Sequence, residues 1–379
     1  MGSSFKPVVY STAMQMGWYP GLVIRDQPTC FPAGGTTEAH PYDGVLCPGN
    51  YLPHNDEYFN WAGPEPLRIL LGNSLNTPAE MTLSFVGMRT DTGANISPLL
   101  AMAQRLGITS LKASAMGYTT AIGTQAVPLL QLTSAYGTFA DQGYHEQPRS
   151  VLSIVRADGK VIEAYNPTPP GYQAISPQAA YMVTSMLVDD NARVADFGHD
   201  NPLHFYGRDV AGKTGTSDAQ RDIVTMGYTP WLAMGVWSGN ADASSMDHII
   251  GIAGAGYIFH DVMAFAIDRL HMPGQLPSRF APAAAGGYFP VPTGMHRAVL
   301  NCHTGLAPWK GMNVLDPKAQ CDPNTQDRVP EVMTPEFVPP WCGDPSKIPP
   351  YYPNETWNCT GKKATNIQAD GWEPMDWGN

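Results

Sequence analysis

Three short polar motifs, far apart in the chain, most constrain the fold that this sequence can adopt. They are Ser3-Ser4-Phe5-Lys6, Ser74-Leu75-Asn76 and Lys213-Thr214-Gly215-Thr216. A serine hydroxyl is a poor nucleophile until a base takes its proton. Residues i and i+3 share a helix face, so the amine of Lys6 can reach the hydroxyl of Ser3. If the other motifs complete the same site, the chain must fold so that all three segments meet in one cleft.

The second and third motifs carry groups that suit a peptide ending in a carboxylate. Ser74 can pass a proton toward a leaving nitrogen, and Asn76 offers a donor and an acceptor to a substrate amide. Lys213 supplies a positive charge, flanked by the hydroxyl groups of Thr214 and Thr216. These residues therefore predict a subsite for the carboxyl end of a substrate.

Two further features fit acyl transfer. Gly215 lets the strand edge come close to a substrate backbone. The main-chain N–H groups of Ser3 and Thr216 are candidates for an oxyanion hole. A lysine that acts as a base must be neutral, and a second cation nearby favours the neutral amine; Lys213 is the expected cation for Lys6.

Periodicity and turn residues predict a mixed α and β chain in which residues 17–63 form a loop. Ser176 is expected to cap a helix that runs from Pro177 to about Leu187. The other expected helices cover residues 4–15, 66–71, 79–86, 98–106, 127–140 and 256–270. The expected strands cover residues 208–214, 222–228 and 231–238, with a hairpin of residues 150–156 and 160–165.

Bulk composition excludes several classes of function. The net charge is −11, and no Lys/Arg cluster offsets it, so a nucleic-acid-binding surface is not expected. No uncharged apolar stretch is long enough to span a bilayer, so any membrane anchoring would need sequence absent from this chain. The chain lacks C-x-x-C and clustered histidines, so no metal site is predicted.

The six cysteines predict disulfide bonds in an oxidising compartment. They fall into sequence-local pairs within segments rich in Pro, Gly and Asn, and their connectivity is open: Cys30, Cys47, Cys302, Cys321, Cys342 and Cys359. After Pro273 the periodicity ends, and Pro, Gly and Trp dominate. We therefore expect one domain over residues 1–271 and an irregular, Pro/Cys-rich C-terminal extension over residues 272–379.

The motifs and their flanking residues resemble the transpeptidase domain of class A (bifunctional) penicillin-binding proteins over about residues 2 to 270. The segments that carry this resemblance are Gly2-Ser3-Ser4-Phe5-Lys6-Pro7, Asn73-Ser74-Leu75-Asn76-Thr77-Pro78-Ala79, residues 121–123 with residues 135–140, and residues 212–216 with residues 227–230 and 236–237. The resemblance implies an α/β (α+β) fold of the penicillin-binding protein and β-lactamase type, with an antiparallel sheet flanked by helices.

By the same resemblance, Ser3 is the acylated nucleophile, Lys6 its base, and Ser74 and Asn76 the second motif. Lys213, Thr214 and Thr216 would bind the carboxylate of a peptidoglycan stem peptide that ends in D-Ala-D-Ala. The implied reaction releases D-Ala and forms a cross-link with an acceptor amine, at the extracytoplasmic face of the bacterial membrane. It needs no cofactor, and β-lactams would inhibit it.

In this family a membrane anchor, a glycosyltransferase domain and a first transpeptidase segment precede the nucleophile. We therefore expect this chain to be a fragment of a longer gene product, without the N-terminal strands of the sheet. Two alternatives remain open at this stage. One is a D,D-carboxypeptidase or β-lactamase-like hydrolase that uses water as acceptor, and the other is a non-catalytic module that binds β-lactams or the cell wall.

Overall fold

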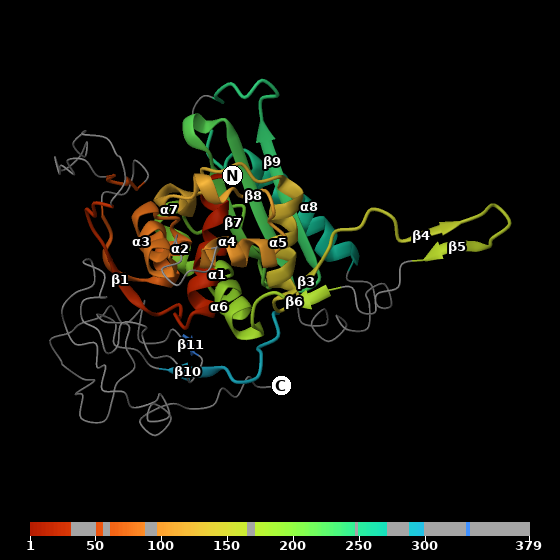
Figure 1. Cartoon of the computed structure of the whole chain (residues 1–379), viewed down its shortest axis with the longest axis horizontal. Helices are drawn as coiled ribbons and strands as arrows, with labels where there is room; N and C mark the ends of the chain where they lie inside the picture. The colour runs from red at the N-terminus through yellow and green to blue at the C-terminus, as the bar shows by residue number, and fades with distance from the viewer. Residues whose placement is uncertain are drawn as a thin grey trace.

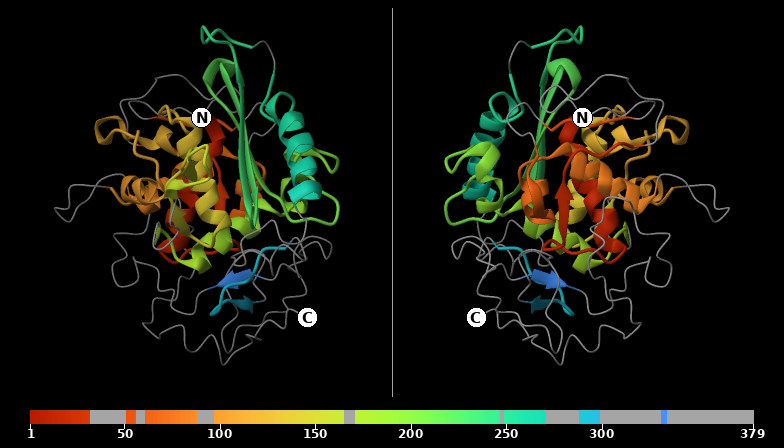
Figure 2. Two further views of the ribbon diagram at one scale, coloured as in Figure 1. Left: turned by 90° about the vertical axis from the view of Figure 1, so that its right-hand side faces the viewer. Right: turned by 90° about the vertical axis from the view of Figure 1, so that its left-hand side faces the viewer.

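The computed structural model describes residues 1–31, 51–55, 61–87, 97–164, 171–246, 249–270, 288–298 and 331–333. Within them, an antiparallel sheet of order β7-β8-β9 lies between two layers of helices (Figures 1 and 2). Its strands are β7 (Ala211–Thr216), β8 (Asp222–Thr229) and β9 (Leu232–Gly239). Helix α8 (Ala255–Leu270) covers one face, and α5 (Leu129–Ala140) and α6 (Pro177–Leu187) cover the other. The expected fold class, an antiparallel sheet flanked by helices, is confirmed.

The sheet register fixes the place of the third motif. Lys213 pairs with Met226, and Thr229 pairs with Leu232 across a turn of two residues. A Cβ atom on Gly227 would lie 2.4 Å from Cζ of Phe259, so this glycine lets α8 pack closely on β8.

Helix α1 (Lys6–Gln15) forms the centre of the helical layer, and every residue in it except Gln15 is buried. Burial on all sides follows from its neighbours, because α3, α4 and α6 all pack against it. A 3-10 turn, η1 (Gly2–Phe5), precedes it and packs against β7. The surrounding helices are α2 (Leu67–Gly72), α3 (Asn76–Val86), α4 (Pro98–Arg105) and α7 (Val194–Phe197), with 3-10 turns η2 (Ala113–Ala115), η3 (Tyr118–Ile122), η4 (Asn191–Arg193) and η5 (Asp218–Gln220).

Serine caps explain where two of the helices begin. Oγ of Ser176 accepts a hydrogen bond from the N–H of Ala179 at 3.2 Å, as its sequence predicts, and α6 starts at the next residue. Ser97 caps α4 in the same way. In both cases proline occupies the first helical position, where no N–H is needed.

The prediction that residues 17–63 form a loop is wrong over residues 23–26, which form a strand. Strand β1 (Val23–Asp26) pairs antiparallel with β2 (Gly63–Pro66). The sequence of β2, Gly-Pro-Glu-Pro, has no strand signature, since proline cannot donate to a ladder. Residues 63–66 are therefore a strand because they pair with β1, and not because of their own sequence. A second short ribbon joins β3 (Tyr144–Glu146) to β6 (Gly171–Gln173).

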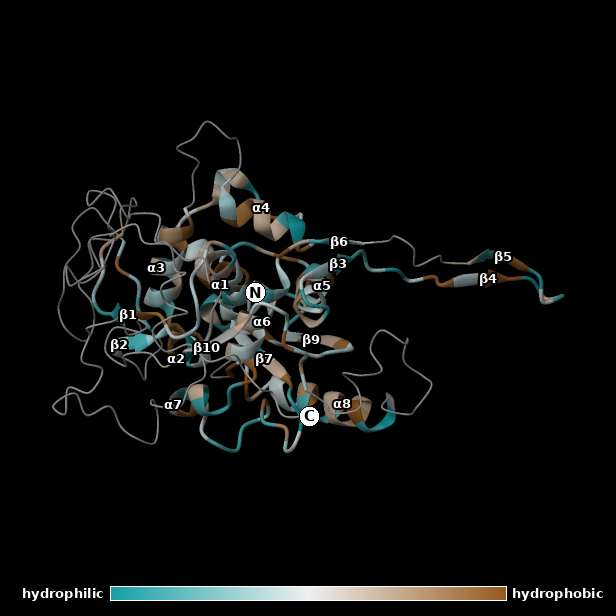
Figure 3. Cartoon of the chain, turned by 90° about the horizontal axis from the view of Figure 1, so that it is seen from below, coloured by the Kyte–Doolittle hydropathy of each residue, from teal (hydrophilic) through white to brown (hydrophobic). Residues whose placement is uncertain are grey.

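A hairpin of β4 (Ser153–Val155) and β5 (Val161–Ala164) extends away from the body of the molecule (Figure 1). It lies within the predicted hairpin, and each strand is shorter than predicted. Figure 3 shows hydrophobic residues on both strands. All seven residues of the two strands are exposed, so the hairpin buries little apolar surface against the body.

Part of the predicted C-terminal extension packs against the main core. Met295 is buried, and the ring of Phe289 lies 5.5 Å from that of Tyr228 on β8. Nε2 of Gln178 on α6 donates to the carbonyl oxygen of Thr293 at 2.8 Å. Strands β10 (His296–Ala298) and β11 (Glu331–Met333) form an antiparallel pair. The boundary at residue 272 stays a prediction.

Cys30 is disulfide-bonded, and the other five cysteines lie outside the described residues, so their pairing stays a prediction. Among the described helices, none combines the length and the hydrophobicity that crossing a membrane requires.

Candidate active site

Two glycines allow the turn that carries Ser3 to lie directly against β7. Gly2 has a φ of 56°, and a Cβ atom on it would lie 2.2 Å from the carbonyl oxygen of Thr216. A Cβ atom on Gly215 would lie 2.3 Å from the carbonyl oxygen of Met1 and 2.7 Å from the amide nitrogen of Ser4. The first and third motifs therefore touch through their backbones, with half-buried Ser3 in the turn between these contacts.

Lys6 lies at the first position of α1, and its side chain is fully buried. Its Nζ atom donates to the carbonyl oxygen of Ser74 and, at 2.7 Å, to Oδ1 of Asn76. Oγ of Ser74 lies 3.5 Å from the same nitrogen. The structure thus brings the lysine of the first motif into contact with the serine and the asparagine of the second.

Ser74 occupies the short connection between α2 and α3, with a left-handed φ of 60°. Residues other than glycine rarely adopt this conformation, and such strain is concentrated at functional sites. The conformation places Oγ of Ser74 within 2.7 Å of Nζ of Lys213, which donates to it. One hydroxyl group is therefore within reach of both lysines.

Lys213 lies on β7 and is almost fully buried. Its Nζ atom also donates to the carbonyl oxygen of Thr214 at 3.1 Å. Burial lowers the pKa of Lys213 to about 7; Asp196 opposes this change, and Arg193 adds to it. Near neutral pH this side chain is therefore poised between the ammonium and the neutral amine.

The side chain of Asn76 is held from both ends. Oδ1 accepts from Lys6, and Nδ2 donates to the carbonyl oxygen of His54 at 2.7 Å.

In the third motif, Oγ1 of Thr216 accepts from the N–H of Gly251 at 3.1 Å, and Thr214 is buried. The missing side chain of Gly215 makes room for the Ser3 turn, a use that the sequence did not predict.

Sequence reasoning missed a group of buried polar residues behind Lys6. Asp26 and Glu80 are fully buried, and both interact electrostatically with Lys6. Burial raises the pKa of Asp26 to about 6 and that of Glu80 to about 8. The available signal for Glu80 was that it is the single charged residue in α3. Asp26 lay in the segment predicted as a loop, and no sequence pattern there indicated a buried carboxyl group.

The candidate residues of all three motifs therefore lie together, although their chemical roles stay predictions. The described residues contain no group of three or more His, Cys, Asp or Glu side chains placed to hold a metal ion. The arrangement offers a serine in a turn, a buried lysine one helical turn later, and a second hydroxyl between two amines. These groups are suited to nucleophilic attack by a serine and transfer of its proton.

Comparison with known protein families gives a match over residues 102–237 to the family described as the penicillin binding protein transpeptidase domain. The matched region contains the third motif; the first two motifs precede it.

Two relatives extend the similarity along the sequence. The chain is 27% identical over 275 residues to penicillin-binding protein 1A of Clostridium acetobutylicum, which covers 70% of this chain and 30% of that protein. It is 30% identical over 238 residues to penicillin-binding protein 1A of Aquifex aeolicus, covering 63% of this chain and 29% of that protein. The chain thus spans less than a third of the length of these curated relatives.

Solved structures share the fold. Penicillin-binding protein 1A from Haemophilus influenzae matches with a TM-score of 0.63 at 20% identity, over 82% of this chain and 46% of that one. The PonA1 protein from Mycobacterium tuberculosis in complex with penicillin V matches with a TM-score of 0.58 at 23% identity, over 77% of this chain and 72% of that one. The second and third motifs thus meet within a fold that these structures share.

Proposed function

We propose that this chain, which is similar to the transpeptidase domain of class A penicillin-binding proteins, is a D,D-transpeptidase of bacterial cell-wall synthesis. Its substrate would be a peptidoglycan stem peptide that ends in D-Ala-D-Ala. The acceptor would be an amine on a neighbouring stem peptide. The site of action would be the extracytoplasmic face of the membrane.

In the proposed acylation step, Oγ of Ser3 forms a bond to the carbonyl carbon of the penultimate D-Ala. Lys6, as the neutral amine, takes the proton from Ser3. The N–H groups of Ser3 and Thr216 would stabilise the oxyanion of the tetrahedral intermediate. The C–N bond to the terminal D-Ala then breaks, Ser74 passes its hydroxyl proton to the leaving nitrogen, and the proton held by Lys6 passes to Ser74.

In the proposed second step, the acceptor amine attacks the ester carbonyl of the acylated Ser3. The acceptor amine loses a proton to Lys6, the new amide bond forms and the ester bond breaks. Lys6 then returns this proton to the oxygen of Ser3. With water in place of the amine, the same chemistry would release a shortened peptide, which is the carboxypeptidase alternative.

The observation that carries the proposal is the position of the Ser74 hydroxyl. Its Oγ atom lies 2.7 Å from Nζ of Lys213 and 3.5 Å from Nζ of Lys6, so it can relay a proton away from the base. Nζ of Lys6 also contacts the carbonyl oxygen of Ser74 and Oδ1 of Asn76, so the second motif holds the proposed base in place.

Lys213 is the proposed anchor for the terminal carboxylate of the stem peptide, together with the hydroxyl groups of Thr214 and Thr216. The same carboxylate exists in penicillins, so we propose that β-lactams acylate Ser3 and inhibit the enzyme. Support comes from the burial of Lys213, because a charge pair in a water-poor site is stronger than one at the surface.

The test is covalent labelling of the full chain with a fluorescent penicillin, followed by mass mapping of the modified residue. We expect a label on Ser3, its loss in Ser3→Ala and Lys6→Ala, and its retention in Ser11→Ala. Ser11 is a matched control, since its buried hydroxyl donates to the carbonyl oxygen of Val8 at 2.8 Å, outside the site. A folded wild-type protein that takes no label would favour the non-catalytic module.

A second measurement separates transferase from hydrolase. The acyl-enzyme is formed from a D-Ala-D-Ala stem peptide, with and without an added acceptor amine, and the products are weighed. A transpeptidase gives the cross-linked amide when the amine is present. Release of only the shortened peptide in both cases would assign a carboxypeptidase.

A further inference from the structure

The second motif begins a helix that has no cap of its own. Helix α3 starts at Asn76, and the preceding residue is Leu75, whose apolar side chain cannot accept a hydrogen bond. The first N–H groups of the helix are instead satisfied from another part of the chain. Oδ1 of Asn55 accepts from the N–H of Asn76 at 2.8 Å and from that of Thr77 at 3.3 Å.

Asn55 is itself fixed by a buried carboxyl group. Its Nδ2 atom donates to Oδ2 of Asp26 at 2.8 Å, and the N–H of Ala62 donates to the same oxygen, also at 2.8 Å. Asp26 is fully buried, and Asn55 is 6% exposed. Rotation of the Asn55 amide by half a turn would break its bonds to Asp26 and to the helix together, so its orientation is determined.

His54, the residue before Asn55, also contacts the second motif. The carbonyl oxygen of His54 accepts from Nδ2 of Asn76 at 2.7 Å, which turns Oδ1 of Asn76 toward Nζ of Lys6. Both the backbone and the side chain of Asn76 are thus bonded to residues 54 and 55. Because Lys6 is fully buried, a small displacement of Asn76 changes the position of the proposed base.

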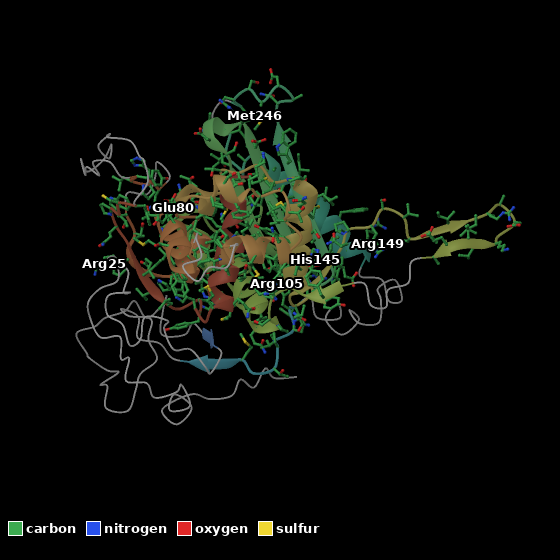
Figure 4. All side chains as sticks on the ribbon, in the orientation of Figure 1. Arg25, Glu80, Arg105, His145, Arg149 and Met246 are labelled. Atoms are coloured by element: carbon green, nitrogen blue, oxygen red, sulfur yellow. The ribbon has the colours of Figure 1, made fainter. Side chains whose placement is uncertain are left out.

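The elements that carry this network lie on one side of the molecule. Figure 4 labels Arg25, next to Asp26 on β1, and Glu80 on α3, and these two elements pack against each other. Among the described residues, Lys6 and Tyr10 interact electrostatically with the Asp26 carboxyl, and Glu80 is a second buried carboxyl group that interacts with Lys6.

We propose that Asn55 and Asp26 are positioning residues for the serine acylation: Asp26 orients Asn55, Asn55 fixes the start of α3, and Asn76 then holds Lys6. The inference rests on the proposed function, because it concerns the rate at which Ser3 is acylated. Asp26 also places a negative charge near Lys6, and this charge favours the ammonium over the neutral base.

The experiment compares the Asn55→Ala, Asp26→Ala and Asp26→Asn variants of the full chain with wild type. Acylation by a fluorescent penicillin is followed as a rate constant against pH, at a temperature where circular dichroism shows each variant folded. Asn201→Ala is the matched control. Its buried amide donates to the carbonyl oxygen of Gly198 and accepts from the N–H of Leu203, both at 2.9 Å, away from the second motif.

We expect Asn55→Ala and Asp26→Ala to slow acylation about 10- to 100-fold, as a displaced catalytic group does. Asn201→Ala should stay within about twofold of wild type. Asp26→Asn keeps an acceptor for Asn55 and should recover most of the rate. Because this variant lacks the negative charge, the acidic limb of its rate profile should move to lower pH by about half a unit.

Hydrogen exchange provides a readout that does not depend on activity. In Asn55→Ala, the amides of Asn76 and Thr77 should exchange at least about tenfold faster, since they lose their acceptor. Acylation of Asn55→Ala at the wild-type rate with an unchanged pH profile, or unchanged exchange at these two amides, overturns the inference alone. A wild-type protein that is never acylated overturns the proposed function, and the inference falls with it.

Discussion

Nζ of Lys213 lies 2.7 Å from Oγ of Ser74, and this bond joins residues that are 139 positions apart in the sequence. Nζ of Lys6 lies 3.5 Å from the same oxygen, so both lysines donate to one hydroxyl group. The left-handed backbone of Ser74 makes this placement possible. The following predictions test what the arrangement does.

Replacing Ser74 with alanine removes the proposed proton relay. We expect the rate of penicillin acylation to fall about 10²- to 10⁴-fold, the usual range for a lost acid–base group. Thermal stability should fall by about 1–3 kcal/mol, because the buried Nζ of Lys213 loses an acceptor, and the rates are compared where both variants are folded. Ser11→Ala is the control: its buried hydroxyl donates to the carbonyl oxygen of Val8 at 2.8 Å, outside the site. Equal acylation rates in the two variants would rule out the relay.

The lowered pKa of Lys213 predicts a pH-dependent affinity for carboxylates. A group with a pKa of about 7 is an ammonium below that pH and a neutral amine above it. Binding of penicillin should therefore weaken as pH rises through about 7. Arginine keeps its charge at all these pH values, so Lys213→Arg should lose this decline even if its overall affinity is lower.

This is measured as the concentration of penicillin that gives half-maximal acylation rate, over about pH 5 to 9. Lys160→Arg, on the exposed hairpin, should reproduce the wild-type profile. A decline that persists unchanged in Lys213→Arg would assign the titration to another group.

A side chain at position 215 should separate the first motif from the third. The added Cβ of Gly215→Ala would lie 2.3 Å from the carbonyl oxygen of Met1, so the backbone of the Ser3 turn must move. We expect acylation to fall at least about 100-fold, since shifts of about 1 Å have this effect on a reacting group. Gly117→Ala is the control, because no atom lies within 4 Å of its added Cβ. Labelling of Gly215→Ala at the wild-type rate would contradict the close packing of η1 on β7.

The buried carboxyl of Glu80 predicts that stability depends on pH. Its pKa is raised from 4.5 to about 8, chiefly by burial, while Tyr51 and Lys6 oppose the change. The folded protein therefore holds a proton that the unfolded chain releases. The resulting stabilisation is complete below about pH 4.5 and is lost as pH rises through about 8.

Glu80→Gln is neutral at every pH and should lack this loss, so its melting temperature relative to wild type should be higher at pH 8 than at pH 5. A change of 1 kcal/mol corresponds to about 2–4 °C for a domain of this size, and we expect a difference of that order. Glu163→Gln, on the exposed hairpin, should show none. A melting-temperature difference that is the same at both pH values would mean that Glu80 is ionised in the folded protein.

Local sequence signals predicted much of the secondary structure. The Ser-Pro starts at Ser97 and Ser176 locate α4 and α6, because a hydroxyl acceptor and a proline act within one helical turn. The β-rich runs predicted at residues 208–214 and 222–228 likewise locate β7 and β8 to within a few residues. By contrast, nothing in Gly63–Pro66 signals a strand, and α3 begins three residues before the predicted start, because Asn55 caps it from a distance.

The sequence by itself determined which chemical groups the site has: a serine with a lysine three residues later, a second serine with an asparagine, and a lysine followed by Thr-Gly-Thr. Only the tertiary structure decided that Ser74 lies within reach of both Lys6 and Lys213. It also decided that the buried polar side chains of Asp26, Asn55 and Glu80 lie next to this site. The physical reason is that side-chain chemistry and local propensity belong to a residue and its near neighbours. Burial and the pairing of distant groups depend on how helices and strands pack.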